Sequence, residues 1–290
     1  MRIFIFAAII LATASGTTAQ PRLTNGDVRP AAVSGSLTRA SLTGAAGKAD
    51  VAWVGYAVPM VDGEHRMCCW SGDGWGNSCC NGCRLEPGAS GTVNISRGAT
   101  PGGPVALEGG SLYVLYRVEK GEINRIRMFS EDCPLDAGGL TLHWLTGVRP
   151  ADSVAVLASF FDSTTNKLTD GALSALSMHR DPVALERLVT AARNGATTHL
   201  RGQALFWVAQ RAGEKAVGVI SEAINKDPET EVKRRAVFAL SQLPKDEGVP
   251  LLIDVARKNP NPAVRKQAMF WLGQSKDARA LKFFEEILFK

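Results

Sequence analysis

Three stretches of the chain repeat one another: LRGQALFWVAQ (200–210), VKRRAVFALSQ (232–242) and VRKQAMFWLGQ (264–274). Each begins 32 residues after the one before it, and a fainter copy, LTDGALSALSM, begins a further 32 residues upstream at Leu168. Similarity at a fixed period indicates a repeat architecture, in which each unit buries its apolar face against its neighbours. The columns shared by the clear copies are Ala204, Ala236 and Ala268; Phe206, Phe238 and Phe270; and Gln210, Gln242 and Gln274.

Each copy continues into a second segment whose apolar residues have helical spacing. The connectors NKDPETE (225–231) and KNPNPA (258–263) supply Asp, Asn and Pro, which end one helix and begin the next. We therefore predict about four helical hairpins over residues 149–290, with residues 152–163 as a half-repeat at the N-terminal end. The matching positions of the second segments are Val217, Val219 and Ile220; Val249, Leu251 and Leu252; and Leu281, Phe283 and Phe284.

Paired helices whose connectors are followed by Val, a basic residue and Ala resemble HEAT-like repeats of the type also found in phycobilin lyases. The resemblance covers the C-terminal half of the chain and implies a right-handed stack of hairpins with an extended surface. HEAT-like arrays serve many functions, and only a few of them are enzymes. A lyase acting on a bilin-like chromophore is one function that the resemblance implies, but export of this protein would separate it from that cytoplasmic chemistry.

The N-terminus, MRIFIFAAIILATASGTTAQ, has the pattern of a secretory signal peptide. A positive charge at Arg2 precedes a short apolar run and then small residues, which predicts cleavage after Ala19 or, alternatively, after Ala14. The apolar run is short for a membrane anchor, which is the other interpretation. We therefore expect a signal peptide over residues 1–19 and a soluble, secreted or periplasmic protein.

The N-terminal half is predicted to be rich in β-strands. Residues 20–48 have the composition of a leader or linker, with a short strand near Leu23 and a short helix around residues 37–45. Residues 49–148 hold strand patterns, the best of which is the hairpin LYVLYRVEKGEINRIRM (112–128) with its turn at residues 119–122. We predict a small antiparallel sheet, and for the whole chain an α+β multidomain fold in which a disulfide-stapled β-rich domain precedes a HEAT-like α-solenoid.

Five of the six cysteines lie in one stretch, CCWSGDGWGNSCCNGC (68–83). An even number of cysteines outside the cytoplasm favours disulfides, although sequence does not select among the pairings. We interpret the stretch as a cross-linked loop that displays Trp70 and Trp75; the loop either only holds its shape or also binds a partner through these two candidate residues. The disulfide candidates are Cys68, Cys69, Cys79, Cys80, Cys83 and Cys133.

Two other hypotheses apply to the same loop. Cys79, Cys80 and Cys83 together with His65 would be a Cys₃His set for zinc, although strong zinc signatures use two well-spaced pairs. Cys80 and Cys83 have the C-x-x-C spacing of a redox site, but the βαβ pattern that usually accompanies it is missing. The principal expectation therefore includes no metal and no cofactor.

No catalytic motif is found elsewhere in the chain, so we expect a protein-binding or scaffolding module and no enzyme. The formal net charge of +5 is weak evidence for an acidic partner, and we expect no nucleic acid. His179 and His199 are expected to be solvated or to cap helices, and Trp207 and Trp271 to lie in the core. Basic residues recur at the start of each first segment, where we expect a solvated, partly ion-paired face: Arg201, Lys233, Arg234, Arg235, Arg265 and Lys266.

The last hairpin repeats the apolar pattern of the interior hairpins, whereas the end of a solenoid is normally polar. Phe283, Phe284 and Phe289 are therefore candidate binding residues. They could pack against the N-terminal domain, against a second copy in a homo-oligomer or against a partner, or be buried within the hairpin itself. With the second helices, this hairpin is the surface that we expect to bind a protein.

Overall fold

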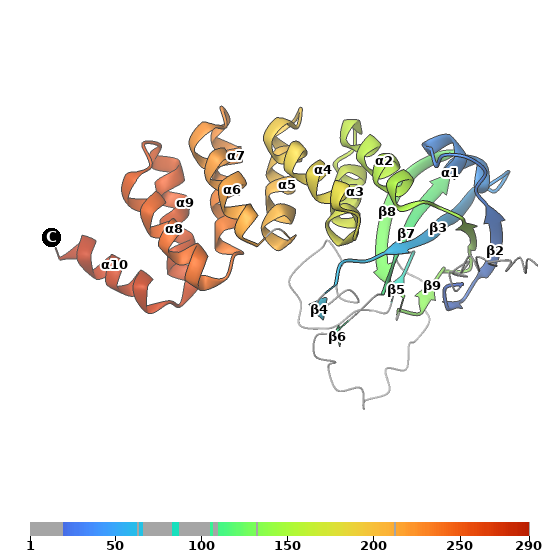
Figure 1. The fold of residues 1–290 in the computed structure, drawn as a ribbon, viewed down its shortest axis with the longest axis horizontal. Coiled ribbons are helices and arrows are strands. Elements are labelled where there is room, and N and C mark those ends of the chain that lie inside the picture. The colour runs from blue at the N-terminus through green and yellow to red at the C-terminus, as the bar shows by residue number, and fades with distance from the viewer. Residues whose placement is uncertain are drawn as a thin grey trace, which may run out of the picture.

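The computed structural model describes residues 20–62, 64–65, 83–86, 105–106, 110–131, 133–211 and 213–289. Within them a β-rich part is followed by a row of stacked helices, which confirms the predicted fold class (Figure 1). The predicted signal peptide, Trp70, Trp75 and four of the cysteine candidates (Cys68, Cys69, Cys79 and Cys80) lie outside the described residues.

The main sheet has five strands in the order β2-β10-β3-β7-β8. The predicted hairpin is confirmed: β7 (Ser111–Glu119) pairs with β8 (Glu122–Ser130) in antiparallel register. Its two-residue turn, Lys120 and Gly121, has φ of 51° and 80°. Both values are positive, as the turns that match the twist of paired strands require.

The prediction of a purely antiparallel sheet is wrong, because β10 (Thr141–Thr146) runs parallel to both of its neighbours, β2 (Asp27–Ala32) and β3 (Val51–Pro59). Alternation in the sequence LTLHWL indicates a strand but carries no information on its direction. The direction follows from the connection, which carries the chain from β8 at one edge to a place between β2 and β3.

Residues 20–48 contribute directly to the β-rich part. They contain β1 (Leu23–Thr24), β2 and α1 (Arg39–Ala45), so the short strand and the short helix expected here are confirmed. Thr38 begins the helix with a capping box in which its hydroxyl accepts from the Ser41 amide at 3.1 Å. Small strands complete this part of the fold: β4 (Glu64–His65) pairs with β6 (Val105–Ala106), and β9 (Leu135–Asp136) lies between β1 and β5 (Cys83–Arg84).

The helical half begins with α2 (Pro150–Ser159) and a 3-10 turn at Phe160–Asp162, which together form the expected half-repeat. Four hairpins follow, and their first helices form one row in which each contacts the next (Figure 1). Asp181, Asn261 and Asp277 cap three of the helices with their side chains. The hairpins are α3 (Asn166–Met178) with α4 (Pro182–Asn194), α5 (Thr198–Arg211) with α6 (Glu214–Lys226), α7 (Thr230–Ser241) with α8 (Lys245–Lys258), and α9 (Pro262–Ser275) with α10 (Ala278–Leu288).

One hydrophobic core runs from the sheet through the helices without a break. At the junction, Gly171 of α3 lies against β8 so closely that a β-carbon there would be 2.8 Å from both Cβ and the carbonyl oxygen of Ile126. The buried hydroxyl of Tyr56 lies 2.9 Å from the hydroxyls of Tyr116 and Ser153, which links β3 and β7 to α2. The sheet and the first hairpin therefore pack as one body.

The helices lead away from the sheet, so that α10 lies at the opposite end of the molecule (Figure 1). The last hairpin consequently does not pack against the described residues of the β-rich part, a contact that was one of the expected arrangements.

Candidate functional site

The cysteine-rich stretch was the first candidate for a functional site, and the structure joins its last cysteine to Cys133, which lies outside the stretch. Cys83 of β5 forms a disulfide with Cys133, with a Cα–Cα distance of 6.0 Å. Both side chains are buried in a second core cluster, on the face of the sheet away from the helices. A Cys83 bonded to Cys133 is available neither to Cys80 for a redox pair nor to the proposed zinc set. Among the described residues, no group of three His, Cys, Asp or Glu could hold a metal ion.

The apolar residues of the last hairpin divide into buried and exposed sets. Phe283 is 2% exposed and lies beneath the guanidinium of Arg257, whose carbon is 5.3 Å from the ring centre. Phe283 therefore belongs to the interior of the hairpin, whereas Phe284 is half-buried and Phe289 is 88% exposed. The other large apolar side chains exposed on α10 are Leu281, Ile287 and Leu288.

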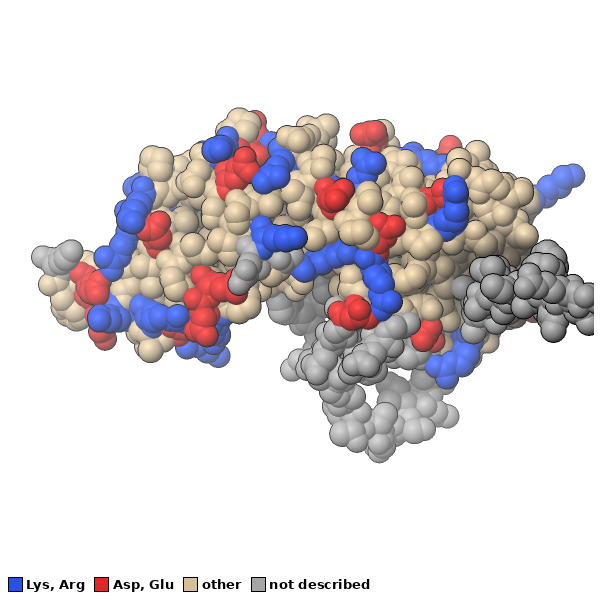
Figure 2. All heavy atoms as spheres, viewed as in Figure 1, with Lys and Arg blue, Asp and Glu red and all other residues tan. Residues whose placement is uncertain are grey.

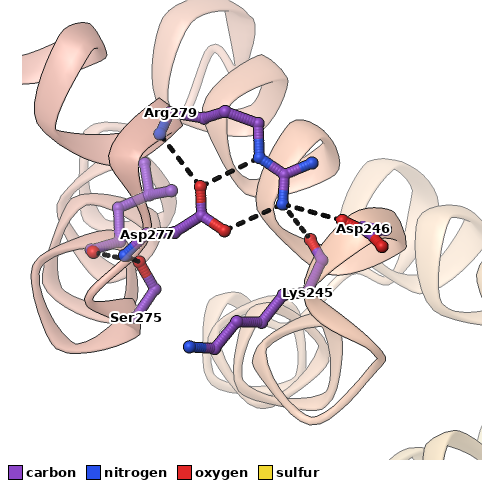
Figure 3. A network of polar contacts seen from close by, with 6 residues as sticks. Lys245, Asp246, Ser275, Asp277 and Arg279 are labelled. Atoms are coloured by element: carbon purple, nitrogen blue, oxygen red, sulfur yellow. Dashed lines mark hydrogen bonds and ion pairs between the residues drawn. The ribbon is translucent and has the colours of Figure 1, made fainter.

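A polar network holds the start of α10 against α8 (Figure 3). The guanidinium of Arg279 donates to both carboxylate oxygens of Asp277, at 2.9 and 2.8 Å, and to the carbonyl oxygen of Lys245 at 3.1 Å. It also reaches the carboxylate of Asp246 at 3.2 Å. Hydrogen bonds from Arg279 hold the pKa of Asp277 well below its usual range. We assign this network to positioning the hairpin.

Two of the recurring basic residues hydrogen-bond to a connector between helices. Arg201 donates to the carboxylate of Asp227 at 2.7 and 3.2 Å and to the carbonyl oxygen of Gly195 at 2.9 Å. Arg265 donates to the carbonyl oxygens of Asn259 and Pro260 at 2.8 and 3.0 Å. The expected ion pairing is confirmed at Arg201, but its side chain is only 12% exposed and so is not solvated. Arg265 bonds to backbone carbonyl oxygens instead, and at both positions the basic residue ties a helix to a connector between helices.

Arg234 and Arg235 are arranged differently, because both pair with the one carboxylate of Glu231, at 3.1 and 3.3 Å. Arg234 also donates to the side-chain oxygen of Gln267 on α9 at 3.3 and 3.4 Å. These residues form the rim of a groove of about 430 Å³ between α7 and α9, which we call the α7/α9 groove. It is lined by Glu231, Arg234, Arg235, Phe238, Gln242, Gln267 and Trp271.

Aromatic rings form the apolar part of this groove and continue beyond it. The rings of Phe206 and Phe238 are stacked, with centres 5.8 Å apart, and Trp271 lies 4.9 Å from Phe238. Phe270, which is 53% exposed, extends the row at 5.0 Å from Trp271. The prediction of a core position is confirmed for Trp207, which is 5% exposed, whereas Trp271 packs against the core and also lines the groove.

His179 is fully buried where β3 meets the end of α3, so the expectation of a solvated side chain is wrong there. Its Nδ1 accepts from the amide of Asp181 at 3.2 Å, which is a local capping role, and among the described residues its Nε2 has no hydrogen-bond partner. Burial lowers the pKa of His179 to about 4. The backbone around it joins the two halves, since Val61 donates to the Met178 carbonyl oxygen at 2.9 Å.

His199 lies at the start of α5 and contacts the carboxylate of Asp170 on α3 at 2.7 Å. It thus links two first helices.

Four helical hairpins at a 32-residue period define the C-terminal half as an α-solenoid. Residues 217–289 match the family of HEAT repeats, and this part of the chain is a HEAT-repeat array. The comparison with curated proteins finds no match.

Among solved structures, the chain is similar to the complex of CpcE and CpcF of phycocyanin lyase from Nostoc sp. PCC7120, with 17% identity and a TM-score of 0.38. The match covers 48% of this chain and 91% of that one. Human deoxyhypusine hydroxylase in complex with glycerol matches with 18% identity and a TM-score of 0.29, over 47% of this chain and 55% of that one. YibA of Escherichia coli matches with 23% identity and a TM-score of 0.33, over 48% and 54%.

Sequence reasoning missed the α7/α9 groove. The signal was present in the repeat, because Phe238 and Gln242 are four residues apart and share one helix face. The adjacent pair Arg234 and Arg235 also has no equivalent in the other clear copies, which hold Gly and Gln or Lys and Gln at these two positions.

Proposed function

We propose that this chain is an exported protein that binds and scaffolds another protein through its HEAT repeats and is not an enzyme. Repeat arrays present long, continuous surfaces, and protein binding is their general use. The observation that carries the proposal lies on the first helices, and not on the second helices expected from the sequence. There a row of aromatic rings crosses α5, α7 and α9 beside a groove with a charged rim.

The polar clusters of the described residues support binding rather than catalysis. The Arg279 network and the Arg201–Asp227 pair each connect a helix to a neighbouring helix or connector, and so they hold the surface in shape. The described part of the chain contains no helix long and apolar enough to cross a membrane.

Export of the protein rests on the pattern of residues 1–19. Cell fractionation followed by N-terminal sequencing tests it, and a mature protein that begins at Gln20 is expected. A chain that stays in the cytoplasm with Met1 in place would overturn this part of the proposal.

Binding is tested with the full chain purified from an oxidising compartment. Proteins cross-linked to it in the host are identified, purified and titrated against it by calorimetry. Saturable binding at a fixed stoichiometry supports the proposal, and heats indistinguishable from dilution for every purified candidate contradict it.

The same preparation separates scaffolding from the redox or zinc hypothesis. Thiols are counted with and without denaturant, and zinc is measured by elemental analysis. We expect neither free thiols nor bound metal, whereas two or more thiols or one equivalent of zinc would favour a functional cysteine centre.

A further inference from the structure

The α7/α9 groove combines an apolar floor with an excess of positive charge. Phe238 and Trp271 supply the floor, and the rim carries two guanidinium groups against one carboxylate. Over the visible face of the helical half, by contrast, blue and red side chains are interspersed (Figure 2).

The two arginines have donors that Glu231 alone does not satisfy. A guanidinium carries five N–H donors in a planar fork, so two of them exceed what a single carboxylate accepts. Arg234 and Arg235 are partly exposed, and their distances to Glu231, 3.1 and 3.3 Å, are long for charge-assisted hydrogen bonds. A second carboxylate at this rim would therefore find N–H donors that Glu231 does not occupy.

The stem of Arg235 packs over a glycine of the neighbouring first helix. Gly202 of α5 has no side chain, and a β-carbon there would lie 2.1 Å from Cδ of Arg235. The stem of Arg235 therefore occupies the space that a larger residue at position 202 would fill. Gly202 stands one repeat before Arg234, so the place in the repeat that holds Arg234 in α7 is held by glycine in α5.

The aromatic rings give the groove an apolar surface beside its charged rim. Phe238 is stacked on Phe206 on one side and contacts Trp271, so its face is shared with other rings. The edges of aromatic rings carry partial positive charge, so a ring edge that faces the groove adds to the preference for an anionic ligand.

From this geometry we propose that the α7/α9 groove binds an extended acidic peptide segment of the protein partner. Arg234 and Arg235 hold a carboxylate of the segment, and Phe238 and Trp271 receive a neighbouring apolar side chain. The proposal rests on the proposed protein-binding function, and it specifies the surface and the chemistry of the partner.

The test uses the full chain and a fluorescein-labelled random copolymer of glutamate and tyrosine, with binding measured by anisotropy. Arg234→Gln with Arg235→Gln removes the carboxylate site and is expected to weaken binding at least tenfold. Gly202→Ala, which displaces Arg235 without removing it, should weaken binding several-fold. Lys266→Gln is the matched control, because Lys266 is the counterpart of Arg234 one repeat further on and does not line the groove.

Two competitor polymers test which chemical groups of the ligand the groove recognises. A lysine–tyrosine copolymer should not compete, and heparin, which is anionic but lacks apolar side chains, should compete much more weakly than the glutamate–tyrosine copolymer. Heparin competing equally well would overturn the peptide assignment in favour of general anion binding. Equal affinities of the wild type and the double variant would overturn the assignment of the groove.

The proposal for the groove and the proposal for protein binding can be rejected separately. If a purified partner still binds the double variant with unchanged affinity, the partner uses another surface and only the groove proposal is wrong. If no purified partner binds the wild type, the proposed function itself is wrong. Circular dichroism of each variant confirms that the helices are intact.

Discussion

Gly171 is the position at which a single methyl group tests how the sheet and the helices are joined. In a helix interior, replacing Gly by Ala normally stabilises by roughly 0.5–1 kcal/mol, because alanine restricts the unfolded chain and favours the helix. At Gly171 the new methyl would lie 2.8 Å from Cβ and the carbonyl oxygen of Ile126, which is inside van der Waals contact. The carbonyl belongs to a strand backbone that cannot rotate away.

Forcing a methyl group into a packed core costs typically about 1–3 kcal/mol. After the helix preference is subtracted, Gly171→Ala should lower the free energy of unfolding by about 0–2.5 kcal/mol, with the middle of the range at about 1 kcal/mol. Gly218→Ala is the matched control, because Gly218 lies in the interior of α6 with nothing within 4 Å of the added methyl, and it should be stabilising.

Urea denaturation of both variants, followed by circular dichroism and by tryptophan fluorescence, measures the difference. The fluorescence reports on both halves, since Trp53 and Trp144 are buried in the sheet and Trp207 is buried in the helices. The reasoning is refuted if Gly171→Ala is as stable as Gly218→Ala, because the helix would then have room that the structure does not provide.

Three further predictions concern the buried polar groups and the disulfide. The pKa of His179 is about 4 in the folded chain and about 6.5 in the unfolded chain. Between pH 6.5 and pH 4 the unfolded state therefore binds more protons than the folded state. The free energy of unfolding should consequently fall by up to roughly 3 kcal/mol from pH 7 to pH 4. His179→Gln should remove most of this fall in urea titrations at pH 7, 5.5 and 4, and an unchanged pH dependence would exclude His179 as its source. Tyr56→Phe deprives the buried hydroxyls of Tyr116 and Ser153 of a shared partner and should cost about 1–3 kcal/mol in the same assay, whereas a neutral effect would show that neither hydroxyl depends on it. Cys133→Ser opens a disulfide between residues 50 apart in sequence and should cost about 2–4 kcal/mol; the melting temperature of this variant should then respond less to reductant than that of the wild type.

The regular elements of the fold were predictable because their signals are local. The 32-residue period identifies all four hairpins, and alternation identifies β7 and β8 together with their turn. The direction of β10 was not predictable, since its parallel neighbours are set by a connection across the sheet.

The candidate site was harder to predict because burial depends on neighbours rather than on the period. Trp207 and Trp271 occupy the same column of the repeat, yet one is buried and the other lines the groove. Phe283 and Phe289 both belong to an apolar pattern, but only Phe289 is exposed. The disulfide of Cys83 with Cys133 likewise required the fold, because sequence alone leaves the pairing open.

Site-specific photocrosslinking in the native host tests most directly the claim that the repeats bind protein at the first-helix face. A photoreactive residue is placed at Gln242, which lines the groove, or at Gln274, the same column one repeat further on and outside the groove. The account predicts a discrete protein adduct from position 242 that is strongly reduced from position 274. Protein adducts from neither position would contradict it, whereas equal adducts from both positions would contradict the assignment of the binding site to the α7/α9 groove.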